Sequence, residues 1–102
     1  MNNNKIIESV EEVVLCFFDV EMEDVKSKCR EQPLPFVRQI LLTQLIKRTS
    51  GITNETMTNR YGYKSHSMCF HSRTTIENLE RFDKDVRNQV KEINKEIDQL
   101  MV

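Results

Sequence analysis

The chain contains few residues of the kinds that interrupt helices or stabilise secreted folds. Its 102 residues include two glycines, two prolines and no tryptophan, whereas an all-β chain needs a turn about every 8–12 residues. The longest apolar run, residues 13–18, is far shorter than the roughly 20 residues that span a bilayer. Three scattered cysteines do not form a disulfide framework, and no export signal follows the first methionine. We therefore expect a cytoplasmic protein with reduced thiols.

The apolar residues that are present recur at helical spacing. They predict a single all-α domain, residues 1–102, with five to six helices that include a helix-turn-helix. Pro35 fits the first turn of the third helix, and Ser65 and Asp83 are expected to cap the last two. The expected helices cover about 4–18, 22–29, 35–50, 54–61, 65–80 and 83–101.

Several of these helices carry residues that favour packing inside the domain. The seam of the fifth helix is expected at Cys69, Ser72, Ile76 and Leu79, and the small Ser72 would allow close packing. Cys16 is predicted to lie in the core. The stripe of the last helix is expected to pack on the domain's own core, with dimerisation as the alternative. Its members are Val86, Val90, Ile93, Ile97 and Leu100.

The charge is unevenly distributed along the chain. Residues 1–26 hold two basic and seven acidic residues, and residues 76–102 hold five basic and seven acidic ones. The first helix is expected to carry its acids on a solvated face, with mimicry of nucleic-acid charge or docking on a basic partner as weaker readings. Residues 27–75 hold eight basic residues against two acidic ones, a net charge of +6. A basic block around a candidate recognition helix favours contact with nucleic acid, with an ordinary solvated surface as the alternative.

The run Tyr61–Ile76 lies within this basic block and has a distinctive order. A glycine turn is followed by a polar helix start and a short helix with one apolar seam, as in helix-turn-helix proteins. The run, together with Arg38-Gln39, resembles the C-terminal DNA-binding domain of the bacterial replication initiator DnaA. That family carries an aromatic-Gly-Gly-Arg-Asp-His-Thr-Thr-Val-Leu-His-Ala signature. Residues 61–72 stand here as Tyr-Gly-Tyr-Lys-Ser-His-Ser-Met-Cys-Phe-His-Ser, and the resemblance covers about residues 10–101.

The resemblance implies a DNA-binding site in this chain. Arg38 and Gln39 would contact phosphates, and Ser65 and His66 would face base edges in the major groove. Lys64, just before the fifth helix, and Ser67 and His71 within it would hold the DNA backbone. The loop arginine that enters the minor groove in the family falls on Gln32, and Arg30 is the nearest basic residue. With four to six phosphate contacts, the slope of log affinity against log salt is expected near −4 to −5, or about −0.9 per contact.

The signature also departs from the family at positions that read sequence. Ser65 replaces an aspartate that can accept a hydrogen bond from cytosine N4, and Met68 replaces a threonine. The chain is therefore predicted to be a non-enzymatic double-stranded DNA-binding protein that regulates replication or transcription. The alternative is a protein-interaction module that keeps the fold and has lost specific DNA reading.

Few other partners or cofactors are expected. No glycine-rich phosphate loop is present, so neither a nucleotide nor another cofactor is predicted. A zinc site at His66, Cys69 and His71 is disfavoured, because a five-residue spacing turns the two histidines about 140° apart on a helix. A homodimer or a replication-protein partner remains an alternative, and no membrane contact is expected.

Overall fold

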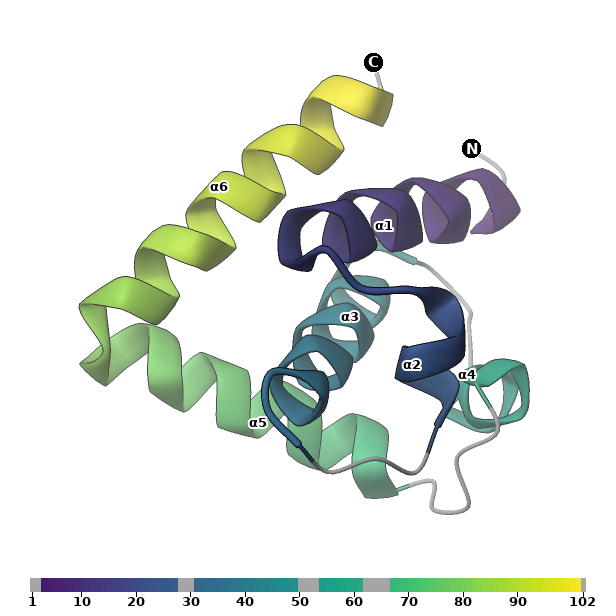
Figure 1. Ribbon diagram of the computed structural model, residues 1–102, viewed down its shortest axis with the longest axis horizontal. Helices are drawn as coiled ribbons and strands as arrows, with labels where there is room; N and C mark the ends of the chain where they lie inside the picture. The colour runs from purple at the N-terminus through teal and green to yellow at the C-terminus, as the bar shows by residue number, and fades with distance from the viewer. Residues whose placement is uncertain (1–2, 28–30, 50–53, 62–66, 102) are drawn as a thin grey trace.

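The computed structural model describes residues 3–27, 31–49, 54–61 and 67–101, and these form a helical fold (Figure 1). No strand occurs in these ranges, so the all-α prediction is confirmed. The predicted helix-turn-helix stays a prediction, because its turn at residues 62–66 lies outside the described part of the chain. The helices are α1 (Asn3–Phe18), α2 (Met22–Lys26), α3 (Leu34–Arg48), α4 (Asn54–Tyr61), α5 (Ser67–Phe82) and α6 (Lys84–Met101).

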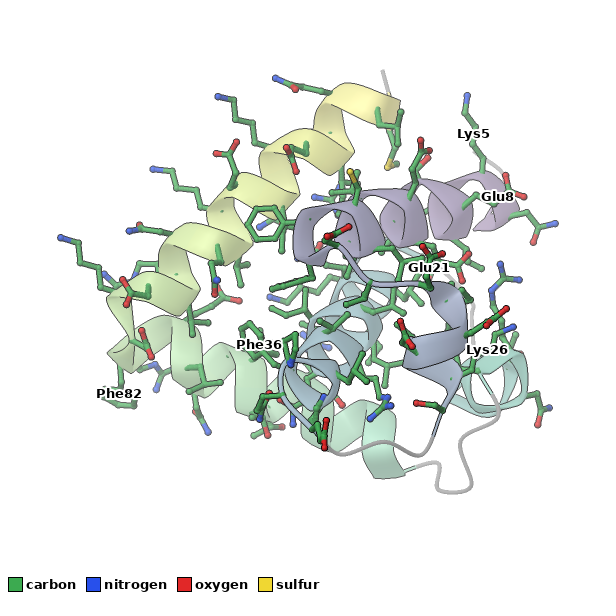
Figure 2. The ribbon with its side chains drawn as sticks, in the orientation of Figure 1. Lys5, Glu8, Glu21, Lys26, Phe36 and Phe82 are labelled. Carbon is green, nitrogen blue, oxygen red and sulfur yellow. The ribbon has the colours of Figure 1, made fainter. Side chains whose placement is uncertain are left out.

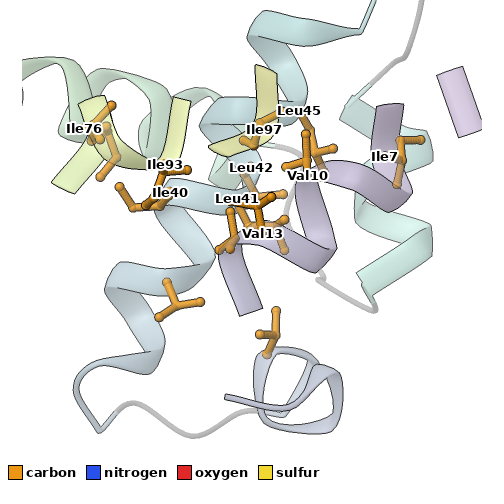
Figure 3. Close-up of a cluster of buried hydrophobic side chains, with 14 of the residues drawn as sticks. Ile7, Val10, Val13, Ile40, Leu41, Leu42, Leu45, Ile76, Ile93 and Ile97 are labelled. Carbon is orange, nitrogen blue, oxygen red and sulfur yellow. The ribbon is translucent and has the colours of Figure 1, made fainter. Parts of the chain in front are cut away.

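Helix α3 lies at the centre of the fold, between α1 and α5 (Figure 1). Its residues 40–42 are all apolar and all buried, and Val37 and Leu45 are buried as well. A helix that is apolar on several sides is stable only when other helices surround it. Figure 3 shows Ile40 and Leu41 among side chains from α1 and α6, so α3 supplies the centre of the hydrophobic core.

The stripe of α6 packs mainly on the domain's own core, as predicted. Val86, Val90, Ile93 and Ile97 are buried, and α6 contacts α1 and α5. Leu100, the last member of the stripe, is 43% exposed. The apolar periodicity therefore identified the core side of α6, although full burial ends at Ile97 and Met101 in the last turn is only partly buried.

The end of one helix and the position of one expected core residue differ from the sequence-based expectation. Helix α2 ends at Lys26 rather than near residue 29, because Ser27 adopts an extended conformation and caps the helix. The prediction that Cys16 lies in the core is wrong, since its side chain is exposed. Cys16 lies about 120° around the helix from the buried Val10, at roughly 100° per residue, and so falls off the apolar stripe.

Asp83 caps α6, as the sequence predicted. Its Oδ1 accepts hydrogen bonds from the backbone N–H groups of Asp85 at 2.9 Å and Val86 at 3.3 Å. Because these donors have no partner within the helix, Asp83→Ala is expected to lower the free energy of unfolding by about 1 kcal/mol. Urea unfolding measures the change. Asp83→Asn keeps a capping oxygen and serves as the control; equal losses in the two variants would contradict a capping role.

Candidate nucleic-acid interface

The structure describes the side chains of only two of the eight predicted site residues, Arg38 and Gln39, which are neighbours on α3. Ser67 and His71 belong to α5, but their side chains lie outside the described part. The other four predicted residues also lie outside it: Arg30, Lys64, Ser65 and His66. Their proposed contacts with DNA therefore stay predictions.

Three helix ends that border the predicted site lie at one edge of the molecule. The carboxyl end of α2, the amino end of α3 and the amino end of α5 are all at the lower edge of Figure 1. Helix α5 packs against α3 and α4, so its amino end has a defined position relative to both. A helix amino terminus offers free backbone N–H groups, which favour a phosphate. This edge is the candidate interface.

Arg38 does not lie on the surface of this edge. Its side chain is only 6% exposed. The guanidinium Nε donates to the carbonyl oxygen of Val25 at 2.8 Å, and Nη2 donates to the carbonyl oxygens of Asp24 at 3.0 Å and Ser27 at 2.8 Å. The last carbonyl groups of a helix lack partners within it, and Arg38 supplies partners for those of α2. A phosphate contact by Arg38 stays a prediction, and this geometry argues against it.

The sequence contains a signal for the internal position of Arg38. On α3, Arg38 lies three residues before Leu41 and seven before Leu45, both of which are buried. Residues at these spacings share a helix face, so Arg38 falls on the apolar stripe. A charged residue on such a stripe is buried only when it is paired or hydrogen-bonded. Gln39 faces another direction, and its side chain is partly exposed at the same end of α3.

The basic block in residues 27–75 is largely neutralised in space. Four of its eight basic side chains form ion pairs with acids of the two acidic flanks. These pairs are Lys47–Glu80 at 3.9 Å, Arg48–Asp98 at 2.8 Å, Arg60–Glu11 at 2.8 Å and Arg73–Glu77 at 2.9 Å. A fifth, Arg38, binds the carbonyl groups of α2. The remaining three, Lys28, Arg30 and Lys64, lie outside the described residues, so the block in the sequence is not a continuous basic surface in the described structure.

The acidic first helix supplies one of these pairs from a buried position. The prediction that its acids lie on a solvated face holds for Glu8 and Glu12, and Figure 2 shows Glu8 on the outer surface. It is wrong for Glu11, which is 9% exposed. Glu11 lies four residues after Ile7 and three before Val14, so it falls on the buried stripe of α1. The spacing of Glu11 from Ile7 and Val14 therefore indicates its burial in the sequence itself.

Glu11 binds the last two residues of α4. Arg60 Nε donates to Oε2 at 3.1 Å and Arg60 Nη2 to Oε1 at 2.8 Å. The hydroxyl of Tyr61, a fully buried side chain, donates to Oε2 at 2.7 Å. Burial raises the pKa of this hydroxyl well above its usual value, and the hydrogen bond to the carboxylate raises the pKa further. The network joins α1 to the residue that immediately precedes the predicted turn.

The seam of α5 is confirmed where its side chains are described. Ser72 and Ile76 are buried and Leu79 is partly buried, while the Cys69 side chain lies outside the described part. A serine at a helix contact fills little space, so the neighbouring backbone can approach closely. Phe82, at the end of α5, projects away from the fold instead (Figure 2).

An open groove lies between α1 and α6. Its volume is roughly 400 Å³, and Glu12, Val13, Cys16, Glu96, Gln99 and Leu100 line it. Figure 1 shows both chain termini at the upper edge, near the carboxyl end of α6, whereas α5 begins at the lower edge. The groove is thus separate from the candidate nucleic-acid interface.

The described residues show neither a metal site nor a membrane-spanning helix. Within them, no three His, Cys, Asp or Glu side chains gather in a way that could hold a metal ion. The disfavoured zinc site at His66, Cys69 and His71 lies outside the described side chains. None of the described helices combines the length and the apolar character that crossing a membrane requires.

Comparison with known proteins finds similarity to a bacterial replication initiator. The chain is 29% identical, over 96 residues, to the chromosomal replication initiator protein DnaA of Treponema denticola. The alignment covers 87% of this chain and 20% of that protein, so the chain spans about one fifth of its relative's length. No protein-family model matches the chain. This similarity agrees with the resemblance of residues 10–101 to the C-terminal domain of DnaA.

Proposed function

We propose that this chain is a single domain that binds double-stranded DNA, catalyses no reaction, and regulates replication or transcription. The observation that carries the proposal is the pair formed by α4 and α5. Helix α4 ends at the buried Tyr61, five residues separate it from Ser67, where α5 begins, and the two helices pack together. This pair coincides with the DnaA-like signature, and the similarity to a replication initiator extends over 87% of the chain.

In this proposal the amino end of α5 enters the major groove. Ser65 and His66 would face base edges, while Lys64, Ser67 and His71 would hold the backbone on either side. Gln39, partly exposed on α3, could donate its amide N–H to a phosphate. Arg38 has an indirect role, because it holds the carboxyl end of α2, from which the chain continues to Lys28 and Arg30.

The internal pairing of the basic block changes the expected salt dependence. Four to six phosphate contacts gave a slope near −4 to −5. Five of the eight basic residues in the block are held by internal partners, so the proposal counts phosphate contacts from the other three alone: Lys28, Arg30 and Lys64. Three neutralised phosphates, at about −0.9 each, give a slope of about −2.7 for log affinity against log salt. Affinity for a mixed-sequence duplex should then fall about 40-fold between roughly 50 and 200 mM salt.

Fluorescence anisotropy of a labelled duplex tests this prediction directly. Lys64→Ala should reduce the size of the slope by about 1, since one phosphate contact is lost. Lys91→Ala, on the exposed surface of α6, makes the same charge change away from the interface and should leave the slope within about 0.3 of the parent's. If the parent binds no duplex at low salt, the proposed function is wrong.

The alternative, a protein-interaction module, is favoured by one specific observation. The side chains of Glu12 and Glu96, in the groove between α1 and α6, have no hydrogen bond or ion pair to any residue the structure describes. Charged side chains beside an apolar surface are compatible with a protein partner. Failure of the parent to bind duplex in the anisotropy experiment would leave this alternative as the better reading.

A further inference from the structure

The carboxylate of Glu11 accepts several hydrogen bonds, although Glu11 lies in α1, far in the sequence from the candidate interface. Both of its oxygens accept hydrogen bonds, and all three observed donors come from Arg60 and Tyr61 in the last turn of α4. The bidentate arrangement fixes the direction of the Arg60 guanidinium as well as its distance. One side chain of α1 therefore sets the orientation of the last two residues of α4.

Stability alone gives little reason for this network. The buried Tyr61 hydroxyl needs an acceptor, but a neutral oxygen would serve, and the Arg60 side chain is 41% exposed and could be hydrated instead. Replacing a buried ion pair by apolar residues of similar volume is often neutral or stabilising, because the charges no longer have to be removed from water. What a satisfied ion pair provides in addition is one preferred geometry. The network therefore suits a role in orientation.

We propose that Glu11 is a positioning residue for DNA binding, acting through Arg60 and Tyr61 on the presentation of α5. The inference rests on the proposed function. Five residues separate Tyr61 from Ser67, and α5 packs on both α3 and α4. An altered direction of the last turn of α4 is thus transmitted to α5 by the contact between the two helices.

The direction in which duplex affinity changes when the Glu11 charge is removed distinguishes a positioning role from simple charge repulsion. An acidic residue repels the DNA backbone over a distance, so removing its charge should leave duplex affinity unchanged or raise it slightly. A positioning residue gives the opposite result, because α5 then meets the groove in the wrong orientation. Glu12, next in the sequence but exposed and without a described partner, offers the matched comparison.

The experiment compares Glu11→Gln with Glu12→Gln in the full chain. Both remove one negative charge, and glutamine is nearly isosteric with glutamate. We expect Glu11→Gln to weaken binding to a mixed-sequence duplex by about 5–20-fold, from the loss of charge-assisted hydrogen bonds, and to reduce the size of the salt slope. Glu12→Gln should bind within about 2-fold of the parent. Anisotropy is measured at a temperature where circular dichroism shows each variant fully folded.

The possible outcomes separate the two levels of the proposal. A parent that fails to bind duplex overturns the proposed function. A parent that binds, with Glu11→Gln equal to it at full folding, overturns the positioning role of Glu11 and leaves the proposed function standing. If Glu11→Gln does not fold, Tyr61→Phe decides: it removes one donor without changing charge and should bind about 2–5-fold more weakly. Parent-like affinity in Tyr61→Phe would then overturn the inference.

Discussion

Arg38→Ala is expected to lower the free energy of unfolding by about 3 kcal/mol, measured by urea or thermal unfolding. The guanidinium is almost fully buried, and it donates hydrogen bonds to the carbonyl oxygens of Asp24, Val25 and Ser27. Alanine leaves the buried carbonyl of Val25 and the partly buried carbonyls of Asp24 and Ser27 without that donor, and it opens a cavity between α2 and α3. The loss should appear in the absence of DNA, because α2 is held to α3 in the free protein.

Arg73→Ala is the matched control for this prediction. Arg73 carries the same charge but is about half exposed, and its partner Glu77 lies one helical turn away on α5. Exposed pairs at this spacing contribute only about 0.3–0.5 kcal/mol, so Arg73→Ala should stay within about 0.5 kcal/mol of the parent. Parent-like stability of Arg38→Ala, together with a salt slope reduced by about 1, would show that Arg38 contacts a phosphate instead.

The features that sequence predicted well are those determined by local order. Helix α4 covers Asn54–Tyr61, the predicted range, and Asp83 caps α6 with the hydrogen bonds that its position before the helix allows. The periodicity of Val86, Val90, Ile93 and Ile97 gave the buried face of α6. Each of these depends on spacing within a few residues, which the sequence states directly.

The features that sequence missed depend on pairs distant in the chain. Arg38 binds carbonyl groups 11 to 14 residues before it, and Glu11 binds side chains 49 and 50 residues after it. Charged residues are usually exposed, so both were placed on the surface. Their position on an apolar stripe was visible, but the partner that makes such burial tolerable was not. The candidate interface was affected most, because its argument relied on charge.

Net charge along a sequence is therefore a weak guide to this surface. The acidic flanks supply the partners of Lys47, Arg48, Arg60 and Arg73, so the fold brings opposite charges together. A DNA-binding role then depends on a few cations and on the geometry of α5 rather than on a broad basic face. Because affinity would depend on the geometry of α5, we expect the contacts of Glu11 with the end of α4 to affect it measurably.

Ile97→Ala is expected to lower the free energy of unfolding by about 3 kcal/mol, as is usual when a large apolar side chain is removed from a packed core. Ile97 is fully buried, and Figure 3 shows it beside Leu45 of α3 and Val10 of α1. Urea unfolding at two protein concentrations measures the loss. Because α6 packs on its own domain, the loss should be the same at both concentrations.

Leu100→Ala is the control, since it removes the same number of carbon atoms from the same stripe at a residue that is 43% exposed. It should cost less than about 1 kcal/mol, because less apolar surface returns to water and no closed cavity forms. If the stripe of α6 were instead a dimer interface, the stability of the parent would rise with protein concentration and Leu100→Ala would remove that dependence. A concentration-dependent loss in Ile97→Ala would likewise assign α6 to an interface between two copies of the chain, because only association links stability to concentration.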